Sequence, residues 1–457
     1  MNSSLAPLCC GFFGDFRSAF RALVPSLRVA EVFALMGPRG AGVPKLSPCE
    51  WLAGLVYHAL AGAGSLASHV LCVTGVKVSD AALSMRGASF GWELLATLLP
   101  RVLRPIAELG LHPGAFHAGL RLVALDGTRF NLRNTVAIKA RALKVKSGPG
   151  GAVGAFAQLL CSVLVELGSH CPLGVSLGWQ GEGELTLARD LFAAIPARAL
   201  LLADRLYGSP WLLWELGPWL GAVESHYLVR VKSNLKVRRL RRLADGSWIV
   251  ALKIQDPHSG RVVGSQLVRE IRAQLRVEGQ GQVLELRLWT SLFDPVAHPA
   301  LGLVQLYAQR WEQELFFREL KGNIHGAGQL LHAQSIDSAA HEVMALMLAA
   351  ALLAGQRVGV AEAAQVPLLR VSLAQVLEQS RALFEILEAG RGVLDAKQTV
   401  EITRRILERL GQTAIIPLRK ARRCQRAERQ PTKAWPKMKT PTSRQLVVEI
   451  SILETNA

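Results

Sequence analysis

Two short apolar runs that each lead into an aspartate constrain the fold of this chain more than any other feature. Residues 122–125 precede Asp126, and residues 199–203 precede Asp204. Both runs have the length and apolar content of buried strands. Ligands of open α/β sheets bind beyond the carboxyl ends of strands, so the two aspartates are candidate site residues. The alternative for either aspartate alone is that it caps the turn after its strand.

Helix and strand patterns alternate along the rest of the chain. Strand patterns occupy residues 156–167, 173–179 and 227–231. Helix patterns occupy residues 183–195, about 299–321 and about 335–390. Strands mixed with helices predict an α/β fold with a mixed sheet. The predicted divisions are an N-terminal helical domain (1–118), an α/β domain (119–390) with a β-rich insertion (233–290), and a C-terminal basic region (391–457).

The pattern of residues 299–321 places polar side chains on an apolar face. At about 100° per residue, four of them share an arc of about 60°: Tyr307, Arg310, Glu314 and Lys321. Apolar residues, Trp311 among them, flank this arc, so we expect it to face the core. The predicted solvated side carries Gln305, Gln309, Glu312, Gln313 and Glu319. Buried charges need partners, which predicts an acidic or phosphate partner for the arc; the alternative is a structural ion-pair network.

Asp126, Asp204 and Glu314 together form a suitable site for hard divalent cations, because Mg²⁺ prefers oxygen ligands. Two such ions, about 3.5–4 Å apart, promote phosphoryl transfer. Clusters of basic residues without acids lie near both aspartates in the sequence. They are Arg129, Arg133, Lys139, Arg141, Lys144 and Lys146 after Asp126, and Arg230, Lys232, Lys236, Arg238, Arg239, Arg241 and Arg242 at the start of the insertion. Such clusters suggest a track for a phosphate backbone.

The overall charge favours the same class of partner. Lys and Arg number 53 against 35 Asp and Glu, a formal net charge of +18. This predicts a polyanionic partner, nucleic acid first and an acidic membrane surface second. Seven scattered cysteines argue against a disulfide framework and structural zinc, and suit a reducing cytoplasm. Two apolar stretches, 51–76 and 343–355, are interpreted as buried helices rather than membrane spans, and no secretory signal is evident.

Three blocks of sequence and one spaced signature resemble the DDE transposases of bacterial insertion sequences. The blocks are residues 126–132 (DGTRFNL), 164–170 (LVELGSH) and 203–207 (ADRLY). The spacing Tyr307-x2-Arg310-x3-Glu314-x6-Lys321 resembles the Tyr-Arg-Glu-Lys signature of the IS-four-type group. The resemblance extends from about Lys77 to Arg357. Leu206 departs from it, because many relatives have glycine there.

This resemblance implies a ribonuclease-H-like catalytic core, with the β-rich insertion between its last strand and the helix that carries Glu314. It implies that Asp126, Asp204 and Glu314 bind two Mg²⁺ or Mn²⁺ ions, and that Tyr307, Arg310 and Lys321 hold DNA phosphates. Arg230 and Lys232 are further candidate DNA contacts from the basic cluster. Trp248 is a candidate by its location alone, because better-known members use an aromatic residue of the insertion to form a hairpin intermediate.

The resulting hypothesis is a cytoplasmic, nucleoid-associated transposase of a bacterial mobile element. It cleaves element ends and joins their 3′ hydroxyl to target DNA, as at least a homodimer and without a membrane. Residues 1–118 bind the element ends, and residues 418–444, with ten basic residues and one acid, form a phosphate-binding arm. The alternatives are a metal-dependent structure-specific nuclease, an inactive transposase-derived DNA-binding protein and, more distantly, a basic membrane-surface protein.

Overall fold

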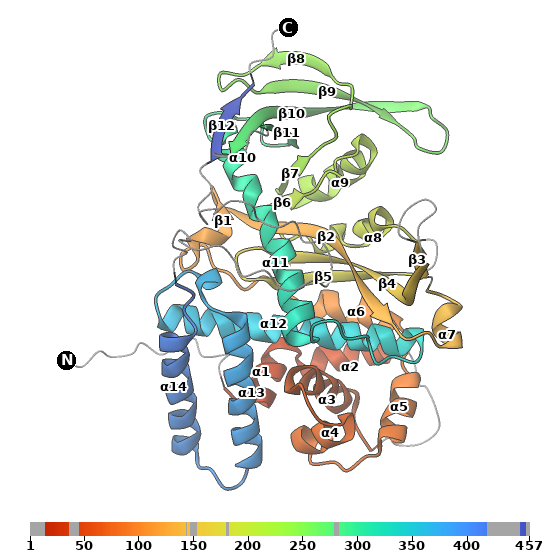
Figure 1. The fold of residues 1–457 in the computed structure, drawn as a ribbon, viewed down its shortest axis with the longest axis vertical. Helices are drawn as coiled ribbons and strands as arrows, with labels where there is room; N and C mark the ends of the chain where they lie inside the picture. Colours follow the sequence, from red (N-terminus) through yellow and green to blue (C-terminus); the bar gives the residue numbers. More distant parts are fainter. Residues whose placement is uncertain are drawn as a thin grey trace, which may run out of the picture.

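The computed structural model describes residues 14–35, 45–142, 144–146, 153–179, 182–277, 283–417 and 448–453. Within these residues, one sheet of 12 strands runs through the middle and upper parts of Figure 1, and helices cover its lower end. The main path of the sheet has the order β3-β4-β2-β6-β7-β11-β10-β9-β8. Outside this path, β5 pairs with β4, β1 with β2, and β12 with β10.

Five strands form the centre of the sheet: β2 (Leu120–Leu132), β4 (Val153–Glu166), β5 (Cys171–Gly178), β6 (Ala199–Ala203) and β7 (His226–Arg230). β4 is antiparallel to both β2 and β5, whereas β6 runs parallel to β2 and to β7. Three antiparallel strands followed by two that run parallel to the first form the predicted ribonuclease-H-like core. Smaller elements at its margins are η1 (Pro113–Ala115), β1 (Phe116–His117), α7 (Val136–Lys139) and β3 (Lys144–Lys146).

Different helices cover the two faces of the central strands. On one face, Leu122, Ala124 and Leu202 pack against α10 (Ala300–Tyr307). On the other face, alternate residues such as Val123 and Leu201 pack against α8 (Glu184–Asp190), the 3₁₀ turn η2 (Phe192–Ala194) and α9 (Pro210–Ala222). This alternation follows from the period of two in a strand. We call these the α10 face and the α8 face.

The lower layer joins helices from both ends of the chain. It contains α1 (Phe16–Leu23), α2 (Ser26–Leu35), α3 (Pro48–Ala61), α4 (Leu66–Thr74), α5 (Asp80–Ala88), α6 (Glu93–Val102), α12 (Ile336–Ala363), the 3₁₀ turn η5 (Leu368–Arg370), α13 (Leu373–Ala389) and α14 (Ala396–Thr413). Their side chains share one apolar cluster with β4 and β5. The α12 helix is long and apolar enough to span a membrane, but 94% of its 18-residue apolar stretch is buried inside the protein. α3 and α4 reach the length and apolar content of a membrane span only if they are taken together, and they are bent by 118° relative to each other. The interpretation as a buried helix is therefore confirmed for residues 343–355, whereas α3 and α4 are only partly buried, with Leu71 45% exposed.

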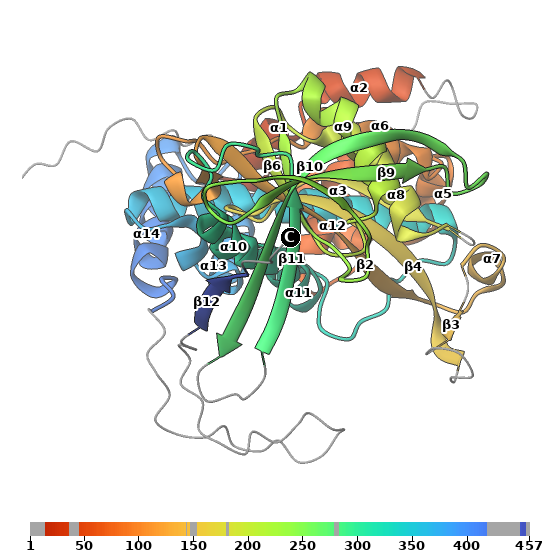
Figure 2. The ribbon, with the colours of Figure 1, turned by 90° about the horizontal axis from the view of Figure 1, so that it is seen from above.

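The β-rich insertion extends the central sheet. It consists of β8 (Arg238–Arg242), β9 (Trp248–Gln255), β10 (Val262–Val277) and β11 (Val283–Thr290). β11 pairs with β7, and β12 (Val448–Ile452), from the end of the chain, pairs with β10 (Figures 1 and 2). The insertion is half-exposed and strand-rich, as its alternating sequence predicts.

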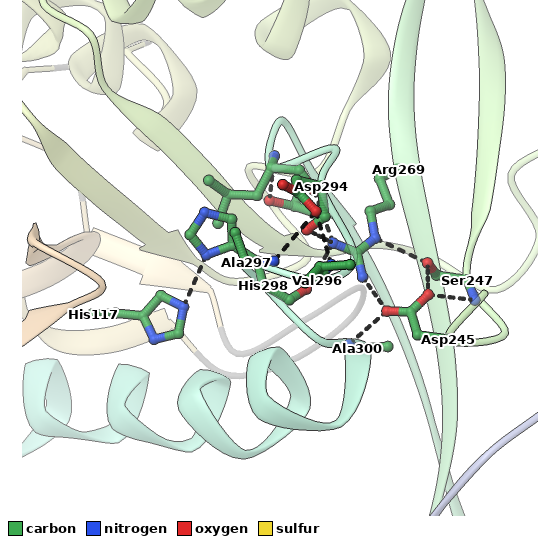
Figure 3. Close-up of polar contacts among 11 residues, drawn as sticks. His117, Asp245, Ser247, Arg269, Asp294, Val296, Ala297, His298 and Ala300 are labelled. Carbon is green, nitrogen blue, oxygen red and sulfur yellow. Dashed lines mark hydrogen bonds and ion pairs between the residues drawn. The ribbon is translucent and has the colours of Figure 1, made fainter. Parts of the chain in front are cut away.

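A buried arginine fastens the insertion to the start of α10 (Figure 3). Arg269 of β10 is fully buried and forms an ion pair with Asp245. It also donates to Ser247 Oγ at 2.9 Å and to the carbonyl of His298 at 2.8 Å. Asp245 in turn accepts a hydrogen bond from the backbone N–H of Ala300 at 2.8 Å. α10 ends at Tyr307 and continues into the segment with Glu314. This contact network therefore fixes where the helix that carries Tyr307 begins.

Candidate active site

The two aspartates lie side by side because of the register of β2 and β6. Ala124 is paired with Leu202, so Asp126 and Asp204 occupy equivalent positions two residues further on. Along both strands, alternate residues point to the α10 face, and both aspartates continue that series. β2 does not end at Asp126, as the sequence suggested, but continues to Leu132 because it stays paired with β4. The parallel partner β6 ends at Ala203, which leaves one side of Asp126 open.

The turn after β6 is capped by its own aspartate. Asp204 Oδ1 accepts a hydrogen bond from the Leu206 N–H at 2.7 Å, and the Asp204 carbonyl accepts one from the Tyr207 N–H at 3.2 Å. The capping role considered for Asp204 is therefore present in the structure. Leu206, the residue that departs from the family pattern, is 40% exposed in this turn.

Arg310 links Asp126 to Glu314. Its Nη2 lies 2.7 Å from Glu314 Oε1, and its Nη1 lies 3.7 Å from Asp126 Oδ2. The side chains of Arg310, Asp126 and Glu314 are 19%, 22% and 37% exposed. A guanidinium group thus occupies the space between two carboxylates at an accessible edge of the sheet.

Tyr307 and Lys321 contact the same edge. The Tyr307 hydroxyl donates to the Ala203 carbonyl at 3.1 Å, next to Asp204. Burial raises the pKa of Tyr307 to about 12, so its hydroxyl stays protonated at neutral pH. Lys321 Nζ donates to the Arg129 carbonyl at 2.7 Å and lies 5.2 Å from the centre of the Phe130 ring. Burial lowers the pKa of Lys321.

The site has an excess of negative charge around Asp126. Burial is the main reason that the pKa of Asp126 rises to about 6, and the charges of Glu184 and Asp204 raise it further. The Gly127 N–H, which donates to Asp126 Oδ1 at 2.8 Å, and Arg310 act in the opposite direction. In the part of the chain that the structure describes, no group of three or more His, Cys, Asp or Glu side chains is arranged to hold a metal ion.

Glu184 was missed in the sequence. It is the first residue of α8, where acidic residues are common because they favour the helix dipole, so its position carried no signal of function. Its Oε1 accepts a hydrogen bond from the Tyr207 hydroxyl at 2.7 Å. Its Oε2 lies 2.5 Å from where a side chain on Gly127 would begin. A glycine at this position therefore leaves room for the Glu184 carboxylate directly behind Asp126.

The predicted helix 299–321 is interrupted, and its predicted solvated side is correct only in part: Gln305 and Gln309 are exposed, whereas Glu312, Gln313 and Glu319 are not. The 3₁₀ turn η3 (Ala308–Arg310) separates α10 from α11 (Trp311–Glu319), and the π-turn η4 (Leu320–Ile324) follows. Gln313 is fully buried and donates to the Val163 carbonyl at 3.2 Å, whereas Trp311 is 51% exposed. The physical reason is that α11 crosses the sheet and also borders the helical layer, so it has two buried sides.

Two glutamates that were expected in solvent hold α11 in place. Glu312 and Glu319 lie 3.1 and 2.7 Å from the two ring nitrogens of His170, which is buried in the turn between β4 and β5. Glu319 also pairs with Arg357 of α12 at 2.5 Å. Burial lowers the pKa of His170, but hydrogen bonds to both glutamates raise it above its usual value. His170 therefore clamps the helix that carries Glu314.

The other predicted DNA contacts occupy different surroundings. Arg230 ends β7, and its charge lowers the pKa of Tyr307, which places it near the aspartates. Lys232 is exposed just beyond β7. Trp248 is half-buried within the insertion, and the Arg239 guanidinium lies 5.2 Å from its ring centre. Arg129, Arg133, Lys139 and Arg141 are exposed along β2 and α7, whereas the side chains of Lys144 and Lys146 and residues 418–444 lie outside the described residues.

Three similarities to known proteins bear on this site. The chain is 27% identical over 266 residues to "Transposase InsG for insertion sequence element IS4" of Escherichia coli (strain K12), which covers 57% of this chain and 58% of that protein. A cryo-EM structure of the piggyBac transposase synaptic complex with hairpin DNA superposes with a TM-score of 0.43 at 10% identity, over 87% of this chain and 86% of that one. Residues 117–353 match the family described as "Transposase DDE domain". Because this match spans more than half of the chain, the protein belongs to that family, as the blocks around Asp126, Asp204 and Glu314 suggested.

Proposed function

We propose that this protein is a DNA transposase that cleaves the ends of an insertion sequence and joins the 3′ hydroxyl to target DNA. Asp126, Asp204 and Glu314 are its catalytic carboxylates. The observation that carries the proposal is the link from Asp126 through Arg310 to Glu314, beside Asp204 at the open end of β6. The name of the relative from Escherichia coli supports the substrate class.

The donor set fits a hard divalent cation. All three side chains offer carboxylate oxygens, the ligands that Mg²⁺ and Mn²⁺ favour. Burial is the main cause of the raised pKa of Asp126, and the negative charges of Glu184 and Asp204, which a cation would offset, add to it. When bound there, two such cations supply Lewis-acid stabilisation of the attacking and leaving oxygens of a phosphodiester.

The remaining side chains bind and orient DNA. Arg310 presents a planar guanidinium suited to a phosphate and is placed to exchange its carboxylate partners for one. Lys321, held by a carbonyl of β2, offers a second cation on the same edge. Tyr307 is a neutral donor whose position is fixed by β6. Arg230 and Lys232 extend this cationic surface towards the insertion. Trp248 serves as an aromatic contact only if Arg239 moves off its ring.

The partners in this proposal are the two ends of the element and a target duplex, held by at least two copies of the chain. The N-terminal helices within residues 1–118 bind the ends, residues 119–390 catalyse, and residues 391–457 add affinity. The protein works in the bacterial cytoplasm at the nucleoid.

Isosteric substitution of the carboxylates tests the proposal. Asp126→Asn, Asp204→Asn and Glu314→Gln each remove a charged oxygen ligand without changing volume, so each should nearly abolish Mg²⁺-dependent cleavage of an end-containing duplex. Gel-shift affinity should be retained. Glu215→Gln, which breaks a half-exposed ion pair between Glu215 of α9 and Arg189 of α8, is the matched control and should cleave normally. Near-normal cleavage by any of the three variants removes that residue from the site.

A second assay separates the alternatives. Supplied with a pre-cleaved 3′ hydroxyl end and a target duplex, a transposase joins the two, whereas a structure-specific nuclease only cuts. A protein that binds ends but neither cuts nor joins them in Mg²⁺ or Mn²⁺ is a non-catalytic derivative. Flotation with acidic liposomes would reveal the membrane-surface alternative.

A further inference from the structure

Behind the two aspartates, on the α8 face, lies a carboxylate that the proposed mechanism does not use. Asp126 and Asp204 continue the alternation of the α10 face, whereas Gly127 and Tyr207 belong to the opposite one. Glu184 reaches that opposite face from the first turn of α8. It lies beside Gly127, and its charge acts on Asp126, whose pKa it raises.

Glu184 contacts both aspartate-bearing segments. Through Oε1 it accepts the hydroxyl proton of Tyr207 at 2.7 Å, and the Tyr207 N–H closes the turn that begins at Asp204. Glu184 Oε2 and Cγ lie 2.5 and 2.8 Å from where a Cβ atom would stand on Gly127, the residue after Asp126. Tyr207 is 3% exposed, so its hydroxyl depends on this carboxylate for its hydrogen bond. One side chain thus connects β2 to the turn after β6, on the rear side of the sheet.

We propose that Glu184 is a positioning residue that braces Asp126 against the Asp204 turn, and so sets the spacing of the two carboxylates for a divalent cation. The parallel pairing of β2 and β6 ends at Ala124 and Leu202, so backbone hydrogen bonds between these two strands do not hold Asp126 to Asp204, although Asp126 stays paired with Val163 of β4. The Tyr207–Glu184–Gly127 contacts continue the connection past that point. This inference rests on the proposed function, because it assumes that Asp126 and Asp204 bind the cation.

Mn²⁺ binding to the full-length protein without DNA, measured by titration calorimetry, tests the brace directly. Glu184→Ala should weaken Mn²⁺ affinity about tenfold, equivalent to about 1.4 kcal/mol, close to the lower limit of what one hydrogen bond to a charged group contributes. Tyr207→Phe should also weaken Mn²⁺ affinity, because it removes the hydroxyl that donates to Glu184. The double variant should be no weaker than Glu184→Ala, since the two residues act as a unit.

Conservative variants distinguish a brace from a charge effect. Glu184→Gln keeps the acceptor for Tyr207 and removes only the charge that acts on Asp126, so it should bind Mn²⁺ more tightly than Glu184→Ala and less tightly than the unmodified protein. Glu215→Gln, on α9 opposite the same helix, should leave the affinity unchanged. If Glu184→Gln binds Mn²⁺ as weakly as Glu184→Ala, the negative charge matters rather than the contact, and the positioning role is wrong.

Asp126→Asn separates this inference from the proposed function. If Asp126→Asn binds Mn²⁺ normally, the cation site itself is misassigned. If Asp126→Asn loses Mn²⁺ while Glu184→Ala and Tyr207→Phe bind it normally, only the brace is refuted. Circular dichroism identifies variants that do not fold, and Tyr207→Phe, which removes a single oxygen, keeps the test decisive if Glu184→Ala is among them.

Discussion

Glu319→Gln removes the charge that holds α11 between the sheet and α12. Glu319 lies 2.7 Å from His170 Nδ1 and 2.5 Å from Nη2 of Arg357, whose side chain is 2% exposed. Burial alone raises the pKa of Glu319, but Arg357 and His170 lower it from 4.5 to about 2. A tenfold change in proton affinity is worth about 1.36 kcal/mol, so ionised Glu319 stabilises the folded protein by about 3 kcal/mol at neutral pH.

The pH dependence of this contribution follows from the sign of the shift. A carboxyl group whose folded pKa is depressed contributes fully above its unfolded pKa, here about 4.5, and loses its contribution as the pH falls towards about 2. At pH 3 the contribution should therefore fall to less than half of its value at neutral pH. His170 behaves in the opposite way, because its pKa is raised: its contribution is complete below the usual pKa of about 6.5 and falls at higher pH. The clamp is strongest between about pH 4.5 and 6.5.

Urea unfolding, followed by tryptophan fluorescence, measures the difference between Glu319→Gln and the unmodified protein. We expect a loss of about 3 kcal/mol at pH 6 that shrinks by more than half at pH 3. Glu312→Gln is the matched control, because Glu312 contacts His170 but not Arg357, and it should cost about 1 kcal/mol. Equal stability of Glu319→Gln and the unmodified protein at pH 6 would show that the His170 clamp does not hold α11. A loss that is the same at pH 3 would show that charge is not the cause.

Three further changes should have measurable effects. Arg269→Met leaves Asp245 without its buried partner and should destabilise the protein by about 3–5 kcal/mol in urea; a cost below 1 kcal/mol would contradict the fastening role. Lys321→Met should weaken gel-shift binding of element ends, whereas Lys397→Met, on α14 away from the site, should not. Replacement of the ten basic residues of 418–444 by Gln should flatten the slope of log affinity against log salt by about 4–5, because about half are expected to contact phosphates, each worth about 0.9. An unchanged slope would mean that these residues do not touch DNA.

Point substitutions are preferable to truncation for this last experiment. The sequence predicts a phosphate-binding arm at residues 418–444, and a deletion from residue 418 onward would be the simplest way to remove it. However, β12 returns to the insertion and pairs with β10 over five residues, from Ala273↔Ile452 to Val277↔Val448. Truncation would expose an edge of β10 as well as remove charge. Neither alternating polarity nor charge predicts such a pairing, because it joins segments that lie far apart in the chain.

Features that leave a local pattern of apolar and polar residues could be predicted from the sequence. The runs before Asp126 and Asp204 are apolar because both faces of their strands are covered, and this pattern is visible without a partner. The alternation within the insertion likewise reflects a half-exposed sheet. By contrast, the continuation of β2 to Leu132 depends on pairing with β4, and the placement of Glu184 behind Gly127 depends on how α8 packs. Neither contact leaves a local pattern.

The signature could be found from its spacing, although the predicted phase of its helix was wrong in part. A uniform helix would place Tyr307, Arg310, Glu314 and Lys321 on one arc, but η3 winds more tightly than an α-helix and η4 more loosely. Tyr307 and Lys321 nevertheless donate to carbonyls of the sheet, at Ala203 and Arg129, and Arg310 lies between Asp126 and Glu314. The phase failed for Glu312 and Gln313 within α11, because this helix is buried on two sides, against the sheet through Gln313 and against His170 through Glu312.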